Sequence, residues 1–349
     1  MKNLRLVLVI VIALLSGCNT YHFTTNVLVP ADITLPQHIE KIGIMNRSLP
    51  EKGNLFNNIL EGFISGESIV ADREATLYGI RNCVSTLNNN PRFKATSLEG
   101  EDYRGTGTKK FPVPLDWNEV DKLCKKYSVD AIVSLETFDS DIMLLPGTVQ
   151  RTRKNKEGKD EKYTVYTAEL RIRTNAGWRV YDNVKKQMID EQVFWDEKAW
   201  DSEGVSPDDA LRKLPNKRAA INDAAAYSGQ MLAFRISPKW LNASRYVYTK
   251  PKKEEAFVKG KELARSNQWK AAAEKWSAVT NYQDEKLAGR ACHNMAVAAE
   301  MEGDLEAAIQ WAEKGYKDKG FKKLSGYLNE LKHRKMDQVK LNEQMKKGD

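Results

Sequence analysis

The change of sequence pattern at Lys250–Lys253 constrains the fold more than any other feature. Before this Lys-Pro-Lys-Lys segment, stretches with a period of two and short apolar runs alternate with helical stripes. Beyond it, small and apolar residues recur at helical spacing. The 349 residues suffice for two domains of the usual ~100–200 residues each. The sequence therefore predicts an α+β chain, with an α/β domain over residues 38–249 and an all-α domain over residues 250–349.

The first domain is predicted to be a layered α/β domain with a mixed sheet. The runs His38–Asn46 and Ala131–Leu135 are typical of strands, and the segment 72–87 between them carries a helical stripe. Strand, helix and strand in this order are typical of layered α/β domains. A further helix is predicted to begin at Asp116 or Asn118, and another at Ser206-Pro207, where a hydroxyl cap precedes a proline.

An antiparallel meander is predicted to extend this sheet. Residues 166–173 alternate between apolar and polar side chains, which is typical of a half-exposed strand. Asn175-Ala176-Gly177 predicts a turn, and the charged segment 151–162 predicts a loop. Two more strands are expected at Trp178–Tyr181 and Met188–Trp195.

The second domain carries a helical repeat pattern. Gly260, Ala272 and Trp276 occupy the small, small and bulky positions of a tetratricopeptide repeat. Ala296 and Ala308 repeat the two small positions about 36 residues later, close to the ~34-residue period of that repeat. The sequence therefore predicts a tetratricopeptide-like domain with a capping helix from Phe321 to about Lys347. The alternative is a generic helical hairpin.

The N-terminus resembles a bacterial lipoprotein signal. Lys2 and Arg5 precede an apolar run to Leu15, which is too short to cross a bilayer comfortably, and Leu15-Ser16-Gly17-Cys18 follows. The resemblance implies that residues 1–17 are removed and that Cys18 carries lipid, the only cofactor expected. Prolines at positions 30 and 36 predict an extended tether over residues 18–37. The alternative is an ordinary secretory signal with a chance cysteine.

This signal also predicts where the protein is located. No acidic run follows Cys18, which favours a periplasm-facing position on the outer membrane, reached through the lipid anchor. The net charge of +8 is spread along the chain, so a nucleic-acid partner is not expected.

The remaining cysteines and the four histidines indicate no metal or redox site. Cys83, Cys124 and Cys292 lack the spacing of a zinc or redox motif. Buried free thiols are the preferred expectation, and a Cys83–Cys124 disulfide is the open alternative. The sequence contains no recognisable catalytic constellation, which predicts a protein that is not an enzyme.

At the scale of the whole chain, the sequence resembles a family of Bacteroidetes lipoproteins. The resemblance rests on the box ending at Cys18, on Ile42–Ser48, on Arg235–Trp240 and on the repeats. It implies an N-terminal α/β domain followed by C-terminal tetratricopeptide repeats, and it implies no activity.

The leading functional hypothesis is a scaffold that binds an envelope protein through the helical repeats. The first helix of each repeat supplies the candidate partner-binding residues Lys259, Glu262, Asn294 and Val297. The aromatic loop over residues 54–69 adds Phe56 and Phe63, which either form a contact surface or fold back on the core.

Two alternatives concern envelope glycans. A glycan hydrolase would use Asp139 or Asp141 as an acid, although a solvated loop explains both residues. A glycan-binding protein would stack sugars on Trp178, Trp195 or Trp200, although these tryptophans could instead fill the sheet core.

Overall fold

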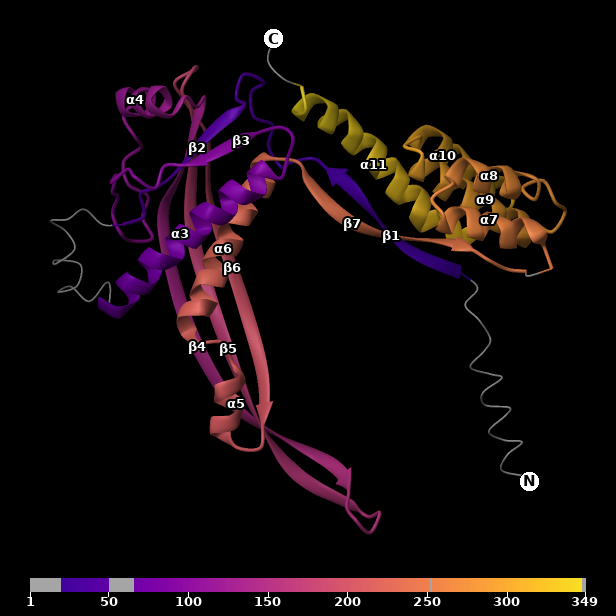
Figure 1. The fold of residues 1–349 in the computed structure, drawn as a ribbon, viewed down its shortest axis with the longest axis horizontal. Coiled ribbons are helices and arrows are strands. Elements are labelled where there is room, and N and C mark those ends of the chain that lie inside the picture. Colours follow the sequence, from indigo (N-terminus) through magenta and orange to yellow (C-terminus); the bar gives the residue numbers. More distant parts are fainter. Residues whose placement is uncertain (1–19, 50–65, 252, 347–349) are drawn as a thin grey trace. The chain divides into compact units, whose positions relative to one another are not determined.

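The computed structural model describes residues 20–49, 66–251 and 253–346 of the chain (Figure 1). They form two compact units. The sheet unit comprises Ala31–Pro238 together with the residues from Gln344 onward, and the helical unit comprises the chain up to Pro30 together with Lys239–Glu343. This division differs from the predicted boundaries at residues 38 and 249, because it groups the strand that precedes residue 31 and the strand that follows residue 238 with the helices.

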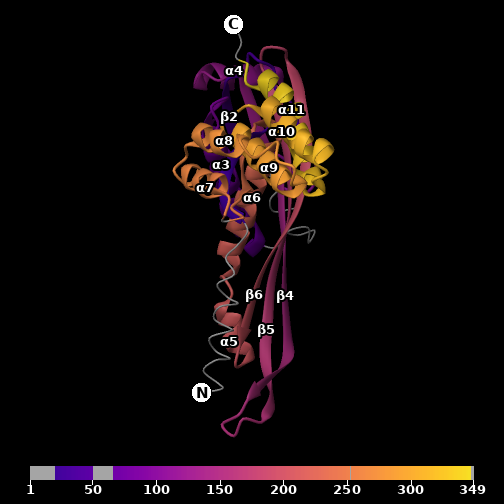
Figure 2. The ribbon, with the colours of Figure 1, turned by 90° about the vertical axis from the view of Figure 1, so that its right-hand side faces the viewer.

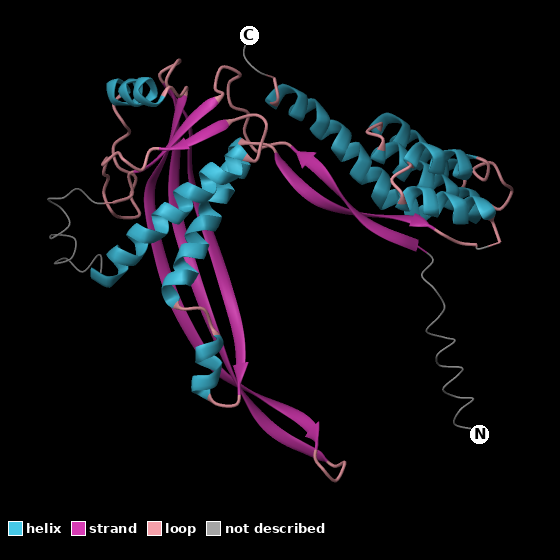
Figure 3. Cartoon of the chain, viewed as in Figure 1, coloured by secondary structure: helices cyan, strands magenta, loops and turns pink. Residues whose placement is uncertain are grey.

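The sheet unit contains a mixed five-stranded sheet in the order β3-β2-β4-β5-β6 (Figure 3). Strand β2 is parallel to β3 and β4, whereas β4, β5 and β6 form an antiparallel meander. The predicted mixed sheet with an antiparallel meander is thus confirmed. The strands are β2 (Lys41–Asn46), β3 (Lys94–Ser97), β4 (Ala131–Lys154), β5 (Asp160–Asp182) and β6 (Gln187–Gly204).

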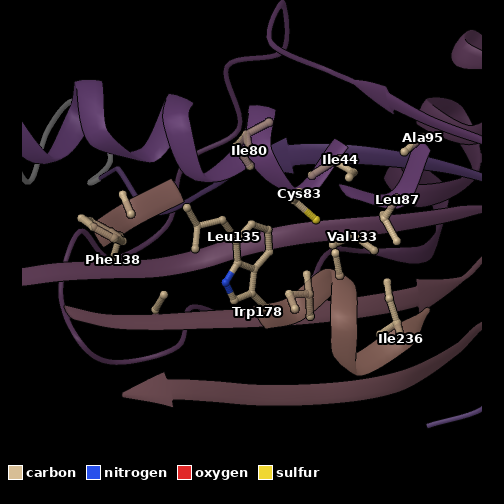
Figure 4. Packing of buried hydrophobic residues seen from close by; sticks show 14 of the residues in the cluster. Ile44, Ile80, Cys83, Leu87, Ala95, Val133, Leu135, Phe138, Trp178 and Ile236 are labelled. Atoms are coloured by element: carbon tan, nitrogen blue, oxygen red, sulfur yellow. The ribbon is translucent and has the colours of Figure 1, made fainter. Parts of the chain in front are cut away.

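Helices α3 (Gly66–Asn88) and α6 (Lys217–Ile236) cover one face of this sheet (Figure 1). Val133 and Trp178 point toward these two helices and are fully buried in the main core (Figure 4). Successive strand residues face opposite ways, so Ile132 faces the other side. There it packs against α4 (Trp117–Tyr127). The short helix α5 (Pro207–Lys213) lies beside α6 on the same side of β4–β6 (Figure 2).

Two helix starts in this unit agree with the sequence. The Asp116 carboxylate accepts a hydrogen bond from the Asn118 backbone N–H at the start of α4. The Ser206 hydroxyl accepts one from the Asp209 N–H at the start of α5, and Pro207 occupies its first turn. Both caps satisfy backbone donors that a helix leaves without partners.

Strands β4 and β5 are much longer than predicted, with 24 and 23 residues. Asn175, Ala176 and Gly177 lie inside β5, where they pair with Asp139, Phe138 and Thr137 of β4. The predicted turn is therefore wrong. Most of the predicted loop over residues 151–162 is the end of the β4–β5 hairpin. Cross-strand pairing along the whole hairpin outweighs the weak strand preference of asparagine and glycine, because that preference depends on context.

The helical unit begins with a two-stranded antiparallel ribbon of β1 (Thr20–Val29) and β7 (Lys239–Tyr248). The predicted tether is thus wrong for residues 20–29. The ribbon packs on helices through aromatic side chains, with the rings of Phe23 and Trp269 5.1 Å apart. The helices are α7 (Glu255–Arg265), α8 (Trp269–Ser277), α9 (Glu285–Met301), α10 (Leu305–Glu313) and α11 (Ser325–Gln344), with short helical turns at Lys314–Asp318 and Lys322–Leu324.

Charged and polar groups are buried within the helical unit. Arg245 of β7 donates hydrogen bonds to both carboxylate oxygens of Glu300 on α9, at 2.7 and 2.8 Å. Tyr327 and Arg334 of α11 also donate to Glu300. His293 is buried beside them, and its Nε2 lies 3.0 Å from the Tyr246 carbonyl oxygen. This network joins the ribbon to α9 and α11.

Cys83, Cys124 and Cys292 are free and buried, which confirms the preferred expectation for the thiols. Burial raises the pKa of the Cys124 thiol to about 12. Within the described ranges, no helix combines the length and the apolar character needed to cross a membrane. Cys18, Phe56 and Phe63 lie outside the described residues.

Candidate functional site

A groove lies on the face of the β4–β5–β6 meander that is opposite α3 and α6. Ile172, Ala176 and Trp178 of β5 point toward the helices, so Arg173 and Asn175 point the other way. The strand register places these two side chains in rows with those of the neighbouring strands. Asp139, Asn175 and Trp195 form one row, and Asp141, Arg173 and Glu197 form the next.

The groove is open and has a volume of about 530 Å³. Lys109, from the segment before α4, reaches over the sheet. Its ammonium nitrogen lies 2.9 Å from a carboxylate oxygen of Asp139 and 3.8 Å from one of Asp141. The hydrogen bond with Asp139 raises the pKa of Lys109, so this ammonium stays charged. The two aspartates of the hydrolase hypothesis are therefore brought together, and a cation bridges them.

The second row holds a further ionic group. Arg173 donates to Glu197 at 2.5 Å, and Arg171 lies 3.3 Å from the same carboxylate. Burial raises the pKa of Asp196, which also lines the groove. Lys109, Arg171 and Arg173 thus lie against Asp139, Asp141 and Glu197, so positive and negative charges balance on this face.

Asn175 and Trp195 distinguish this groove from an ordinary charged surface. Only 5% of Asn175 is exposed, and its side-chain oxygen has no hydrogen-bond partner among the described residues. A buried polar atom without a partner costs free energy unless a ligand or water satisfies it. Trp195, beside Asn175, is 72% exposed. A flat apolar ring therefore borders a buried amide whose oxygen has no hydrogen-bond partner among the described residues.

The segment that carries Lys109 is held on the sheet by close packing. The Phe111 ring covers Gly177, where an added Cβ would lie only 2.8 Å from the ring and 2.4 Å from the Thr137 hydroxyl oxygen. Arg179 stacks over the same ring, 4.7 Å from its centroid, and donates to the Pro112 carbonyl oxygen at 2.7 Å. Glycine at position 177 therefore allows the wall of the groove to approach the sheet.

A buried ion pair also holds the segment that carries Lys109 in place. Arg47 of the β2–α3 connection donates to Glu136 at 2.8 Å and to the Val113 carbonyl oxygen at 3.2 Å. Tyr181 donates to the other oxygen of Glu136 at 2.8 Å. Burial raises the pKa of Glu136, and the nearby Arg47 opposes this effect.

The three tryptophans of the glycan-binding hypothesis occupy different environments. Trp178 is fully buried in the core (Figure 4). Trp200 is half-buried and packs against the same core. Trp195 alone among these three offers an exposed ring, so the core explanation holds for Trp178 and not for Trp195.

The residues predicted to bind a partner through the repeats do not share one accessible groove. Lys259 and Glu262 are exposed on α7 and pair with neighbouring charges of the same helix. Asn294 and Val297 are fully buried on α9, so their prediction as contact residues is wrong. The Asn294 amide exchanges hydrogen bonds of 2.7 and 2.9 Å with the Tyr248 backbone, and Val297 lies in the same core. The chain's own ribbon occupies that surface.

Sequence analysis does not predict the other six residues that line the groove: Lys109, Arg173, Thr174, Asn175, Asp196 and Glu197. Asn175 was assigned to a turn, and Lys109 lies in a polar loop far from the meander in sequence. The alternation over residues 166–173 continues to residue 181 in the structure, and following it further would have placed Asn175 on the same face as Arg173.

Two family models match the chain. One, described as a domain of unknown function (DUF8603), covers residues 39–248. The other, also described as a domain of unknown function (DUF6340), covers residues 258–333. None of the curated proteins matches this chain.

Solved structures offer distant similarity. The PelC dodecamer from Paraburkholderia phytofirmans is 6% identical, with 62% of this chain and 99% of that chain covered and a TM-score of 0.23. A putative neuraminyllactose-binding hemagglutinin homolog from Helicobacter pylori is 10% identical, with 58% and 86% covered and a TM-score of 0.24. TM-scores this low support no inference about this chain.

Proposed function

We propose that this chain, which belongs to the family of the domain of unknown function DUF8603, is a lipid-anchored envelope protein that binds a neutral saccharide in the groove of its sheet unit. The observation that carries the proposal is the pairing of the exposed Trp195 ring with the unsatisfied, buried oxygen of Asn175. A sugar ring presents C–H groups that stack on an indole, and its hydroxyl groups can donate to the asparagine oxygen.

The charges of the groove support a neutral ligand. Ligand sites combine an apolar surface with a few placed polar groups, and here these are carboxylates, an ammonium and a guanidinium. The cations and carboxylates on this face are paired with one another, which favours a ligand without a charge of its own.

Binding is a better explanation of the groove than hydrolysis. A general acid needs a carboxyl group whose pKa is raised by burial or by a like charge. The side chains of Asp139 and Asp141 are 36% and 67% exposed and share the Lys109 ammonium, so neither has the buried environment that a general acid needs.

Replacing Trp195 with alanine is expected to weaken saccharide binding by roughly tenfold or more, because the stacking surface is lost. A glycan array with neutral oligosaccharides would identify a ligand for the full chain, and isothermal titration would then measure its affinity. Asn175→Ala should weaken binding similarly. Trp240→Ala is the matched control, since Trp240 is also exposed but lies on β7. Equal affinity of the wild type and Trp195→Ala, or no neutral ligand on the array, would contradict the proposal.

The lipid anchor is part of the proposal and has its own test. Three acyl chains on Cys18 would hold the protein on the membrane, since each buried CH₂ contributes about 0.8 kcal/mol. Cys18→Ala is expected to move the protein from the membrane fraction to the soluble fraction. Cys18→Ala protein that remains in the membrane fraction would contradict lipid anchoring at this residue. The absence of acids after Cys18 supports a periplasm-facing position on the outer membrane.

We further propose that α7–α10 are two tetratricopeptide-like repeats. At position 260 an added Cβ would lie only 2.2 Å from the Trp276 indole nitrogen, so glycine allows the close approach of α7 and α8. Ala296, Ala308 and Ala312 are packed together in the second helix pair. Small residues at matched positions of both pairs support the repeat.

A further inference from the structure

The long hairpin of β4 and β5 lacks a third strand over its outer end. Strand β6 pairs with β5 only as far as Tyr166, whereas the β4–β5 pairing continues to Lys154 and Asp160 (Figure 3). Val149 in this stretch is 45% exposed, and Leu145, nearer the core on the same edge strand, is 44% exposed. An isolated two-stranded hairpin is marginally stable in water, and a third strand would stabilise it.

The meander has two free edges. Strand β2 pairs with β4 only up to Leu135, and β6 is the last strand of the sheet. Among the described residues, Ile142–Lys154 and Gln187–Gly204 make no backbone–backbone hydrogen bond beyond their pairing with β5. Two carbonyl groups of β6 accept side-chain hydrogen bonds, Val193 from Gln192 and Glu203 from Lys213, both at 2.8 Å. Unpaired strand edges are templates for pairing with another chain.

The two edges are complementary in charge. Strand β6 carries six acidic residues and a single lysine over its 18 residues. The end of β4 carries Arg151, Arg153 and Lys154 and no acid after Asp141. Like charges therefore oppose pairing of β4 with β4 and of β6 with β6, whereas β4 attracts β6.

We propose that the β4 edge of one copy pairs in parallel with the β6 edge of a second copy. Both strands run antiparallel to β5, so this pairing continues the sheet from one copy into the next. Segment Thr137–Lys154 has the same length as β6, and matching the two end to end defines the register. Leu145 then lies beside Trp195 of the second copy, and Val149 lies beside Ala199 of the second copy.

This register is favourable for charges as well as for apolar contacts. It places Arg151 beside Asp201 of the second copy on the face that carries the groove, and Arg153 beside Glu203 of the second copy. These two pairs outnumber the single like-charge pair, Asp141 beside Glu191 of the second copy, at the inner end of the segment. A shift by two residues in either direction would put Val149 beside an acidic residue, Asp201 or Glu197. A shift by one residue would exchange the faces. The matched register thus avoids both conflicts.

The contacts that pairing would disturb are weak. Arg151 now pairs with Glu203 and Arg153 with Glu161 of the same copy, and all four side chains are about half exposed. Exposed ion pairs contribute little stability, so exchanging partners costs little. Pro146 has no N–H to donate, which removes one bond from the new ladder, but proline is tolerated at such an edge.

Because each copy uses two different edges, the contact is head-to-tail and forms a ring or a filament. The second copy would place Leu145 beside Trp195 and thereby add an apolar wall to the groove. The assembly does not depend on saccharide binding, so the proposal of assembly and the proposal of saccharide binding can be contradicted independently.

Sedimentation velocity of the full chain in mild detergent, without saccharide, tests the assembly. The wild type is expected to associate, and Arg151→Glu with Arg153→Glu should weaken association by about tenfold or more. Adding Asp201→Lys and Glu203→Lys to the same chain should restore it. A wild type that stays monomeric up to about 100 µM at low salt, or a charge-swapped chain that fails to recover, would overturn the proposal.

Disulfide trapping tests the register independently. A mixture of Val149→Cys and Ala199→Cys proteins is expected to form a mixed disulfide, since these positions are adjacent on one face. A mixture of Thr148→Cys and Ala199→Cys proteins is the control, because these side chains lie on opposite faces. The native thiols at positions 83, 124 and 292 are buried and should not compete. Preferential crosslinking of Val149→Cys with itself would instead indicate pairing of two β4 edges and would overturn the proposal.

Discussion

Replacing Arg47 with alanine is expected to lower the free energy of unfolding of the sheet unit by about 3–5 kcal/mol. Arg47 is 7% exposed, and its partner Glu136 is fully buried. Without the guanidinium, Glu136 would keep the Tyr181 hydrogen bond at 2.8 Å and the longer-range attraction of Arg179, but it would have no charged hydrogen-bond partner. An uncompensated buried charge is far more costly than the intact pair is stabilising.

The pH dependence of this variant follows from the buried carboxylate. Burial already raises the pKa of Glu136, and loss of Arg47 should raise it further. A raised pKa in the folded variant favours the protonated acid. The difference in unfolding free energy between the wild type and the variant should therefore be largest well above the usual glutamate pKa of ~4.3, and it should shrink as the pH falls toward that value.

Chemical denaturation monitored by circular dichroism would measure the loss. The matched control is Arg47→Met with Glu136→Leu, which removes both charges and retains similar volume. This double variant should be close to the wild type in stability, because replacing a buried ion pair by apolar residues is often neutral or stabilising. A loss below about 1 kcal/mol for Arg47→Ala would show that solvent reaches Glu136 and compensates its charge.

Acidification is expected to destabilise the helical unit by on the order of 3 kcal/mol between pH 7 and pH 4. Burial lowers the pKa of His293 to about 4, whereas histidine in an unfolded chain titrates near ~6.5. In this window the unfolded chain binds a proton that the folded chain does not. Folding stability therefore falls as the pH decreases from about 6.5 to 4.

Unfolding measurements across this pH range, compared with His293→Gln, would test the prediction. The glutamine amide can still donate to the Tyr246 carbonyl oxygen but does not titrate, so the variant should show a flatter profile. The titration of Glu300 does not affect the comparison between the wild type and His293→Gln. Burial raises the pKa of Glu300, but hydrogen bonds from Arg245 and Tyr327 outweigh burial and lower it below the usual value. Ionised Glu300 stabilises the folded state at every pH above ~4.3, the pKa of glutamate in the unfolded chain. This stabilisation is lost only as the pH falls through the lower pKa of Glu300 in the folded state. Equal slopes for the two proteins would mean that His293 does not control acid stability.

Local sequence chemistry determined several elements without any tertiary information. Asp116 and Ser206 mark helix starts because their side chains satisfy nearby backbone donors, an interaction that spans only two or three residues. The run Ala131–Leu135 is apolar enough to require cover on both faces, and it is the buried part of β4. The helical character beyond residue 253 follows in the same way from spacing along one chain segment.

Tertiary structure alone decided the pairing of strands and the positions of the groove residues. Tyr21 and Phe23 became strand residues because β7 pairs with β1, and Asn175 stayed in β5 because Asp139 lies opposite it. Asn294 carries no local sign of burial, yet the ribbon covers it. Alternation of apolar and polar residues indicates that a segment can form a strand, but it does not identify the partner strand. Pairing depends on contacts between residues far apart in sequence. The groove combines Lys109, Asp139 and Trp195, so it exists only once those distant segments have paired.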